Sequence, residues 1–562
     1  MLKFPNNVTS GLQAVFAAFR RTAEGGARKH KGKAWSKKMT KYLLKRLLHA
    51  LVSVVIVVAI VMVLIYSLMD RNLIFAQDPI FSKQANNQKE AYKYRKWEEY
   101  GYLDYVTYAD WLNMLVANGD ITEETKNEVV KFGRKPADDA GKVKEYVDKF
   151  SDYYEGKGYT VVRLDARMAG KTKKYANGGQ EQYFAYKNNP LIGRVWDYFT
   201  GIITVDNIHY AQGEIENRGI KFVAKDPVYG VEKFSPAIMG NGTKYKYLLY
   251  CDSRFPYIHQ NLVSVNLGKS YVVNSGIDVF TTMNRSQGSY VKSVITYPSG
   301  LTEESADDLH SATYVKDSQH TSLIYETRYV DDYTNVMTTK GGMSKVGYSF
   351  SIGIVSVLLS YFLGIPIGII MALKKDKLVD KIGTVYIIFI IAVPSLAYIF
   401  LFKAIGGKIG LPTTFDMESS SKLMFVLPII SLALPSIAGL MKWLRRYMID
   451  QMNSDYVKFA RSGGLTEGEI FTKHILKNAI IPIVHGVPGA ILGSVVGAII
   501  TERVYVVPGA GNLLTTAINA YDNGVIVGLT LFYALLSVVS LILGDILMAM
   551  VDPRISFSTK AR

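Results

Sequence analysis

The chain has 562 residues, of which 49% are hydrophobic, and a formal net charge of +17. Its one cysteine, Cys251, excludes an internal disulfide and a metal site built from cysteines. Several charge-poor stretches reach the length of about 20 residues that a helix needs to cross a bilayer, whereas residues 70–345 contain none. These features exclude a wholly soluble protein and predict a membrane domain interrupted by one extramembrane domain.

Hydropathy predicts six membrane-spanning helices. They cover residues 47–69, 346–373, 382–402, 423–441, 482–501 and 525–551. Prolines fall inside several spans, but membrane helices tolerate proline where neighbours satisfy the freed backbone groups. The predicted fold class is an all-α membrane domain of six transmembrane helices with an inserted extracytoplasmic α+β domain.

The charge distribution predicts the orientation. With the N-terminus inside, the cytoplasmic pieces are residues 1–47, 374–381, 442–480 and 551–562. They carry 26 Lys and Arg but 8 Asp and Glu, so the whole basic excess lies on one side, as the positive-inside rule requires. We therefore expect a multi-pass protein of the cell membrane with both termini in the cytoplasm, and no nucleic-acid partner is needed to explain the basic charge.

This orientation divides the chain into five parts. The expected domains are a basic cytoplasmic extension at 1–46, the first span at 47–69, an extracellular domain at 70–345, the permease-like membrane domain at 346–551, and a cytoplasmic tail at 552–562. In the extension, Leu12, Val15, Phe16 and Phe19 share one helical face. This pattern fits an interfacial helix attracted to anionic lipid, and it fits a solvated basic tail equally well.

Residues 70–345, which we call the outer segment, read as helical up to about Tyr154. After Gly158 they become short alternating runs typical of an antiparallel sheet. Two tripeptides, 170–172 and 268–270, resemble the end of a phosphate-binding loop. That motif requires a glycine five positions before its second glycine, where this chain has Asp165 and Val263, so we reject nucleotide binding. No metal-ligand spacing or nucleophile motif is evident, and we expect no catalytic residue and no metal ligand.

The loop between the fourth and fifth spans, 442–480, carries the strongest functional signal. It has one helical stretch up to Ser462, a break at Gly463-Gly464, and a second helical stretch that enters the next span. A helix–turn–helix at the cytoplasmic face could dock into a groove on a soluble partner, or it could be a basic loop that only sets topology.

The spacing Ala460-x-x-x-Gly464 followed by Lys473-His474-x-Leu-x-Asn478-Ala-x-x-Pro resembles the "EAA loop" of binding-protein-dependent ABC importer permeases. The form is that of the B-type subunit in the oligopeptide, dipeptide and nickel branch, although Lys458-Phe459-Ala460 replaces the literal Glu-Ala-Ala. The resemblance implies contact with an ATPase subunit by the following residues: Asp455, Tyr456, Ala460, Arg461, Gly463, Gly464, Leu465, Lys473, His474 and Asn478.

Further motifs resemble the same family. Residues 42–48 are similar to its entry into the first span, and residues 501–518, with Glu502, Pro508, Gly509 and Gly511, to its signature after the fifth. Asp545, Asp552, Pro553 and Arg554 are similar to its C-terminal signature, and we expect them to have structural roles. The enlarged outer segment resembles the peptide permeases of Gram-positive bacteria.

The resemblance implies a subunit without enzymatic activity of its own. Its implied partners are a homologous second permease, two cytoplasmic ATPases that bind ATP and Mg, an extracellular lipoprotein receptor for peptides, membrane lipid and the peptide substrate. It implies no cofactor on this chain. Oligopeptides are the favoured substrate, with dipeptides or nickel as the alternative, because nothing in the sequence separates them.

In the fifth span, Gly489, Gly493 and Gly497 recur every four residues, a pattern that permits close helix contact. The stripe fits static packing within the subunit, and it also fits a moving interface or the wall of a transport pathway. His485 and Asp545 are ionisable groups in or near spans, which favours pairing, and for Asp545 we expect a role in helix packing.

Two rival classes fit the sequence less well. A self-sufficient channel or secondary transporter often shows internal repeats or paired broken helices, and no repeat is evident here. A membrane-anchored sensor or surface enzyme would need a functional constellation in the outer segment, and no catalytic constellation is found there.

Overall fold

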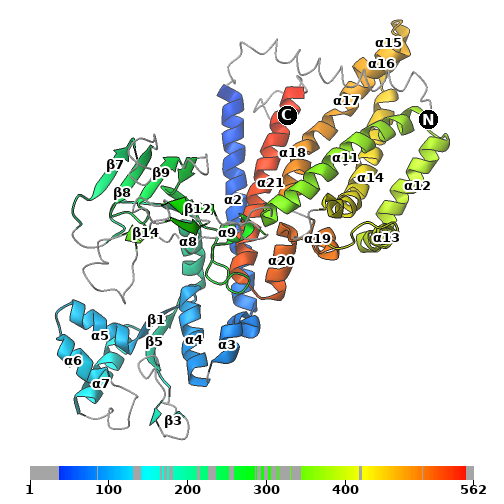
Figure 1. Cartoon of the computed structure of the whole chain (residues 1–562). Coiled ribbons are helices and arrows are strands. Elements are labelled where there is room, and N and C mark those ends of the chain that lie inside the picture. Colours follow the sequence, from blue (N-terminus) through cyan, green and yellow to red (C-terminus); the bar gives the residue numbers. More distant parts are fainter. Residues whose placement is uncertain are drawn as a thin grey trace.

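The computed structural model describes residues 37–84, 86–130, 141–164, 168–169, 174–175, 182–211, 215–225, 236–251, 258–284, 287, 293–296, 302–305, 313–314, 329–330, 343–416, 421–496 and 498–551. The expected helical face at 12–19, Gly497 and the C-terminal motif 552–554 lie outside these residues. The described residues form a helical bundle and an outer segment that adjoins the end of α2 (Figure 1).

The bundle is built from long, charge-poor helices. Among the described residues, five segments are long and apolar enough to cross a membrane: α2 (Lys37–Leu68), α11 (Lys345–Leu373), α14 (Val426–Met452), the segment formed by α18 (Ile481–Val496) and α19 (Ile499–Tyr505), and α21 (Asn523–Val551). Helix α11 packs against α14 and α18, and α21 packs against α18 and α2. Helix α2 therefore joins the bundle mainly through α21, the last helix of the chain.

The third expected span is not one continuous helix. Helices α12 (Leu378–Ala392) and α13 (Ser395–Lys408) meet at 110°, so the pair is either a broken span or a re-entrant loop. Pro394 has no N–H to continue the helix, and Val393 before it is extended (φ −84°, ψ 127°), as the residue before proline prefers. By contrast, Pro366 and Pro435 lie inside the uninterrupted helices α11 and α14.

Shorter helices complete the bundle. They are α15 (Asp455–Ser462), α16 (Glu467–Ile470), a π-helical turn at Phe471–Leu476, α17 (Lys477–Ala479), α20 (Ala510–Asn519) and a 3-10 turn at Lys422–Phe425. In Figure 1, α15 and α16 project from the end of the bundle opposite the outer segment.

The outer segment has the expected α+β composition with antiparallel sheets. Its helical elements are a 3-10 helix at Arg71–Gln77, α3 (Pro79–Lys83), α4 (Asn86–Glu99), α5 (Tyr108–Ala117), α6 (Glu123–Val129), α7 (Gly141–Gly156), α8 (Leu191–Gly201) and α9 (Val279–Asn284). Its larger sheets have the strand orders β1-β5-β2 (Leu103–Thr107, Tyr183–Asn188, Thr160–Arg163) and β10-β9-β8-β7 (Ile258–Gln260, Tyr247–Cys251, Ala237–Asn241, Gly219–Val223). Two-stranded ladders pair β11 (Val263–Val265) with β6 (Ile203–Val205), β12 (Ser293–Thr296) with β13 (Thr302–Ser305), β14 (Thr313–Tyr314) with β15 (Tyr329–Val330), and β3 (Met168–Ala169) with β4 (Lys174–Tyr175).

Strand β5 separates two aromatic cores because side chains alternate across a strand. Tyr183 and Ala185 belong to a core formed with α5 and α7, whereas Phe184 belongs to a core that includes Trp97 of α4. The sequence pattern that predicts a strand thus also divides the apolar side chains between two faces.

The outer segment also shares a core with the membrane helices. Leu267, Val279 and Met283 are buried together with Val58 of α2 and Val525 of α21. This shared core fixes one part of the outer segment against the ends of the first and last spanning helices.

Candidate functional site

The α15–α16 unit is anchored by one apolar face. Val457 and Ala460 of α15 are buried against Leu444 and Met448 of α14, in a cluster that also contains Ile470. These spacings place Val457 and Ala460 on the same side of the helix. The unit is therefore packed onto the bundle and is not a free loop.

The double glycine ends α15 with a Schellman motif. The N–H of Gly464 donates to the carbonyl of Arg461 at 3.1 Å, and the N–H of Leu465 donates to that of Ala460 at 3.3 Å. Gly464 has φ +82°, and a Cβ there would meet no atom within 4 Å. Gly464 is thus required by its backbone conformation. In this cap the carbonyl of Ala460 accepts a hydrogen bond and Gly464, four residues later, adopts the positive φ, which accounts for the spacing Ala460-x-x-x-Gly464.

The next helix starts with a capping box. Thr466 and Glu469 exchange side-chain and backbone hydrogen bonds, and Lys473 Nζ lies 3.0 Å from Glu469 Oε1. The Lys473 ammonium, and next the N–H of Thr466, lower the pKa of Glu469 to about 2. Arg461 forms a two-pronged ion pair with Glu467, which links the two helices across the turn.

Three of the predicted loop residues meet at one point. Asn478 Nδ2 donates to the hydroxyl of Tyr456 at 3.0 Å, and the Tyr456 ring lies 6.3 Å from the ring of His474. The Tyr456 hydroxyl in turn donates to Gln451 Oε1. These contacts tie α15 to α17 and to the end of α14, so Tyr456, His474 and Asn478 position the unit.

Phe459 is not among the residues predicted to contact an ATPase subunit. Its side chain is 80% exposed, although phenylalanine usually avoids solvent, and it lies on α15 between the buried Val457 and Ala460. The period of the buried residues could have shown that Phe459 faces outward. An exposed aromatic residue on an anchored, capped helix is a suitable knob for a protein partner.

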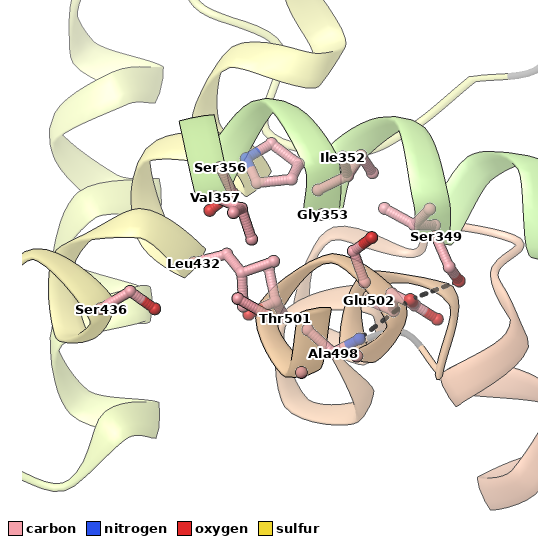
Figure 2. A pocket seen from close by; sticks show the side chains of 16 residues that line it. Ser349, Ile352, Gly353, Ser356, Val357, Leu432, Ser436, Ala498, Thr501 and Glu502 are labelled. Carbon is pink, nitrogen blue, oxygen red and sulfur yellow. Dashed lines mark hydrogen bonds between the residues drawn. The ribbon is translucent and has the colours of Figure 1, made fainter. Parts of the chain in front are cut away.

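A cavity of about 210 Å³ lies inside the bundle, between α11, α14, α18 and α19. Its lining combines small and hydroxyl-bearing side chains with apolar ones, as Figure 2 shows for Ser349, Gly353, Ser356 and Thr501. Gly489 and Gly493 of α18 also line it, which associates two residues of the glycine stripe with an internal space.

Glu502 lies at one side of this cavity and is only 2% exposed. Ser349 Oγ donates to its carboxylate at 2.7 Å, and the backbone N–H of Ala498 donates at 3.1 Å (Figure 2). The backbone N–H of Asn512 donates to the same carboxylate at 3.0 Å. The carboxylate thus receives an N–H from the first turn of α20, where helix amides lack internal partners. We find that Glu502 joins α11, α19 and α20.

The glycines near Glu502 are needed for this contact. A Cβ on Gly509 would overlap the Glu502 carboxylate, and one on Gly511 would lie 3.0 Å from the backbone nitrogen of Ile499. Pro508 precedes them in the turn before α20. Val506, at the end of α19, has φ 57°, a conformation that is strained for a β-branched residue.

Comparison with known proteins gives the family. The model of the binding-protein-dependent transport system inner membrane component matches residues 364–557. The oligopeptide transport system permease protein AmiC of Streptococcus pneumoniae is 32% identical over 504 residues, which cover 88% of this chain and 94% of AmiC. The chain belongs to the peptide permeases of binding-protein-dependent ABC importers.

Two further relatives share a smaller part of this permease. The dipeptide permease DppB of Bacillus subtilis is 29% identical over 216 residues, which cover 38% of this chain and 68% of DppB. The oligopeptide permease OppB of Haemophilus influenzae is 26% identical over 210 residues, which cover 37% of this chain and 69% of OppB. The AmiC alignment is too long to be confined to the membrane helices, so AmiC shares much of the outer segment with this permease.

The glycine stripe of the permease has two roles among its described members. A Cβ on Gly489 would lie 3.1 Å from Ser540 Oγ of α21, whereas one on Gly493 would meet no atom within 4 Å. Close approach of α11 and α18 comes instead at Gly353, where a Cβ would overlap Ser494. Gly489 therefore serves packing, and Gly493 borders open space in the cavity.

Asp545 connects three helices of the permease. It is buried in α21, forms an ion pair with Arg46 of α2, and lies 3.6 Å from His485 Nε2 of α18. Its carboxylate thus links α2, α18 and α21, and the expected role in helix packing stays a prediction. Arg46 was not predicted, although it ends the basic run before the first span and could have been proposed as the partner.

Asp522, between α20 and α21, was also missed. Its fully buried carboxylate accepts hydrogen bonds from Ser270 Oγ and from the backbone N–H groups of Tyr271, Val272 and Val273, at 2.6 to 2.9 Å. Gly524 permits this approach, because a Cβ there would overlap the carbonyl of Lys269. The outer segment is thus attached to the last spanning helix by a buried anion.

In the part of the chain that the structure describes, no group of three or more His, Cys, Asp or Glu residues is placed to hold a metal ion.

Proposed function

We propose that this chain forms, with a homologous second permease, the pathway for oligopeptide uptake, and that its α15–α16 unit transmits the movements of a cytoplasmic ATPase. In this proposal ATP and Mg bind two partner ATPases, this chain binds no cofactor, and an extracellular lipoprotein receptor delivers the peptide. Oligopeptides are favoured over dipeptides or nickel because the relative named for oligopeptides aligns over 88% of the chain.

The observation that carries the coupling role is the contrast between the two faces of α15. Val457 and Ala460 are buried against α14, so a push on the helix would move α14. Phe459 is 80% exposed, so it is available to fill a groove on a partner. Mechanical coupling between two subunits requires a helix that is fixed to its own subunit and presents an exposed apolar side chain to the partner, and α15 with Phe459 meets both conditions.

The path of such a movement can be followed through the bundle. Helix α14 packs extensively against α11, and both helices line the cavity together with α18 and α19. Rotation of α14 relative to α18 would change the cavity shape, with Gly493 leaving room for that change. The cavity would then be one part of an alternating pathway completed by the second permease.

The test is Phe459→Ser in the full transporter. We expect labelled-peptide uptake to fall about tenfold or more, because loss of a buried aromatic anchor costs an interface about 2 kcal/mol or more. The amount of chain in the membrane should not change, since Phe459 is solvent-exposed within this chain. The ATPase subunits should co-purify with the variant in reduced amount.

Ile80→Ser is the matched control, because Ile80 is also an exposed apolar residue but lies on α3 of the outer segment. It should retain uptake and ATPase association. If Phe459→Ser transports peptide as the unsubstituted protein does, α15 is not the coupling element and the proposal is wrong.

A further inference from the structure

A polar cavity of about 320 Å³ lies at the end of α2 that meets the outer segment. Arg71, Arg194, Asn188 and Asn189 contribute its charged and amide groups, and no carboxylate lines it. The remaining lining residues are Tyr66, Met69, Tyr102 and Leu191. Two guanidinium groups and two side-chain amides give the cavity the chemistry of an anion site.

Aromatic rings hold both guanidinium groups in place. Arg194 Cζ lies 3.8 Å from the ring centroids of Tyr66 and of Tyr102, whose rings meet edge to face at 86°, so the group lies in the corner between them. Arg71 Cζ lies 3.9 Å from the Trp97 ring, and its Nη1 donates to Asn188 Oδ1 at 3.0 Å. A guanidinium has five N–H donors, so the hydrogen bonds to Tyr102 and Asn188 leave donors for an anion, and neither arginine has a carboxylate partner among the described residues.

Helix α8, which contributes Arg194, is apolar on two faces. Val195, Tyr198 and Phe199 pack against the core formed by α2 and α21. On another face, Ile192 is 84% exposed and Trp196 is 69% exposed. The strand pair that follows α8 continues this surface with four exposed apolar side chains, those of Ile203, Val205, Val263 and Val265.

Exposed apolar side chains are also found on α2 next to α8. Leu64 and Leu68, in the last turns of the spanning helix, are exposed, and α8 contacts α2 directly. Tryptophan concentrates at the boundary between lipid tails and headgroups, and arginine binds phosphate by two N–H groups. Two arginines at the end of a spanning helix, with exposed apolar side chains beside them, therefore match the two parts of a phospholipid, its phosphate and its acyl chains.

We propose that the cavity binds the phosphate of an anionic phospholipid headgroup, with Ile192 and Trp196 of α8 inserted beside its acyl chains. The transported peptide is a poorer occupant, because no residue of α11, α14, α18 or α19 lines this cavity. The bound lipid would fix the outer segment against the membrane next to the first spanning helix.

Lipid binding is tested by native mass spectrometry of the purified full-length chain. The probes are palmitoyl-oleoyl phosphatidylglycerol and, as a phosphate-free comparison, diglucosyl diacylglycerol. For Arg71→Gln/Arg194→Gln we expect the dissociation constant of the first phosphatidylglycerol to rise about tenfold or more, because two charge-assisted contacts are lost. Glycolipid binding should not change.

Lys126→Gln/Lys149→Gln is the charge-matched control, since it removes two positive charges from exposed helices of the same outer segment. It should change phosphatidylglycerol affinity less than about twofold. Arg71→Gln alone keeps the contacts of Arg194 with Tyr66 and Tyr102, so its intermediate loss of affinity would separate lipid binding from misfolding. Equal affinity in all variants, or an equal loss in the control, would overturn the proposal.

Competition identifies the source of the anion. Neither inorganic phosphate nor trialanine at millimolar concentration should displace the lipid. Displacement by phosphate would make this a site for soluble anions, and displacement by trialanine would make it a peptide carboxylate site. Either result would reject the lipid assignment.

The position of α8 is tested by quenching of tryptophan fluorescence in vesicles of brominated phosphatidylglycerol. Trp196 is one of five tryptophans in the chain, so Trp196→Phe should remove a distinct quenched component. An unchanged quenched fraction would contradict insertion of α8 beside the acyl chains.

Discussion

Ser270 Oγ donates a 2.6 Å hydrogen bond to the carboxylate of Asp522, although 252 residues separate the two positions. Ser270 belongs to the Gly-Lys-Ser tripeptide whose resemblance to a phosphate-binding loop was rejected. The sequence argues against nucleotide binding at this tripeptide. In the structure, the loop around Ser270 instead surrounds the carboxylate of Asp522, an anion of the same chain. Consecutive backbone N–H groups that converge on one carboxylate make the same kind of concave anion site that phosphate loops use.

Asp522→Asn should destabilise the permease and loosen the outer segment. Asparagine would place an NH2 group against donors that now share a carboxylate, so we expect a loss of about 2–3 kcal/mol in the free energy of unfolding. Unfolding followed by circular dichroism, with the rate of proteolysis in the outer segment, measures this effect. Asp197→Asn on the exposed side of α8 is the control and should behave as the unsubstituted chain, and equal stability of the two variants would refute the role of Asp522.

Gly464→Leu should impair transport, whereas Gly463→Ala should not. Gly464 has φ +82°, at which a side chain with a Cβ costs about 1–2 kcal/mol, while Gly463 has φ −75°. Peptide uptake at equal membrane levels is the measurement. Asparagine tolerates positive φ better than leucine, so Gly464→Asn should preserve more peptide uptake than Gly464→Leu. The opposite order would show that the space around residue 464, and not its backbone conformation, requires glycine.

The proposed orientation predicts opposite labelling of two introduced cysteines. In a Cys251→Ser background, Asn118→Cys in the outer segment should react with an impermeant maleimide in intact cells. Ser462→Cys at the end of α15 should react only after permeabilisation, although both sites are exposed in the structure. The reverse pattern would place α15 away from the compartment that contains ATP, and the importer proposal would fail with it.

High pH should destabilise the outer segment through its buried tyrosines. Burial, and next the nearby Tyr66, raise the pKa of Tyr102 from 10.0 to about 12. Since the folded pKa exceeds the unfolded one, this stabilisation is complete below pH 10 and is lost as pH rises through about 12. In Tyr102→Phe, the free energy of unfolding should fall less steeply between pH 10 and about 12 than in the control Tyr153→Phe, on the exposed face of α7. Identical slopes in the two variants would show that Tyr102 does not cause this loss of stability.

Local sequence patterns predicted most of the elements because those elements depend on local physics. Charge-free runs predicted the spanning helices. The alternation of side chains along Tyr183–Asn188 explains why this strand has two buried faces. Gly463-Gly464 marked the end of α15 because a Schellman cap requires a residue that accepts positive φ. Pro394 shows the limit: it breaks its span while Pro366 and Pro435 do not, and the difference depends on neighbouring helices that satisfy the backbone.

The candidate site was predictable only in part. Composition and spacing selected Glu502, Gly509 and Gly511, but did not reveal that one carboxylate needs both glycines to reach α20. Phe459 was overlooked because it lies within a motif whose other members drew attention. The pairs Ser270–Asp522 and Arg46–Asp545 join residues that are far apart in the sequence. The basic run that ends at Arg46 could have suggested a partner for Asp545, but nothing near Ser270 points to Asp522.

The attachment at Asp522 has a consequence for biosynthesis. Ribosomes deliver the loop around Ser270 long before α21, so the core that Leu267 and Val279 share with α2 and α21 is incomplete until the final helix inserts. A chain that stops before Asp522 would leave this loop without its anion and would expose those side chains. The final packing of the outer segment therefore depends on completion of the last helix, although that segment is synthesised earlier.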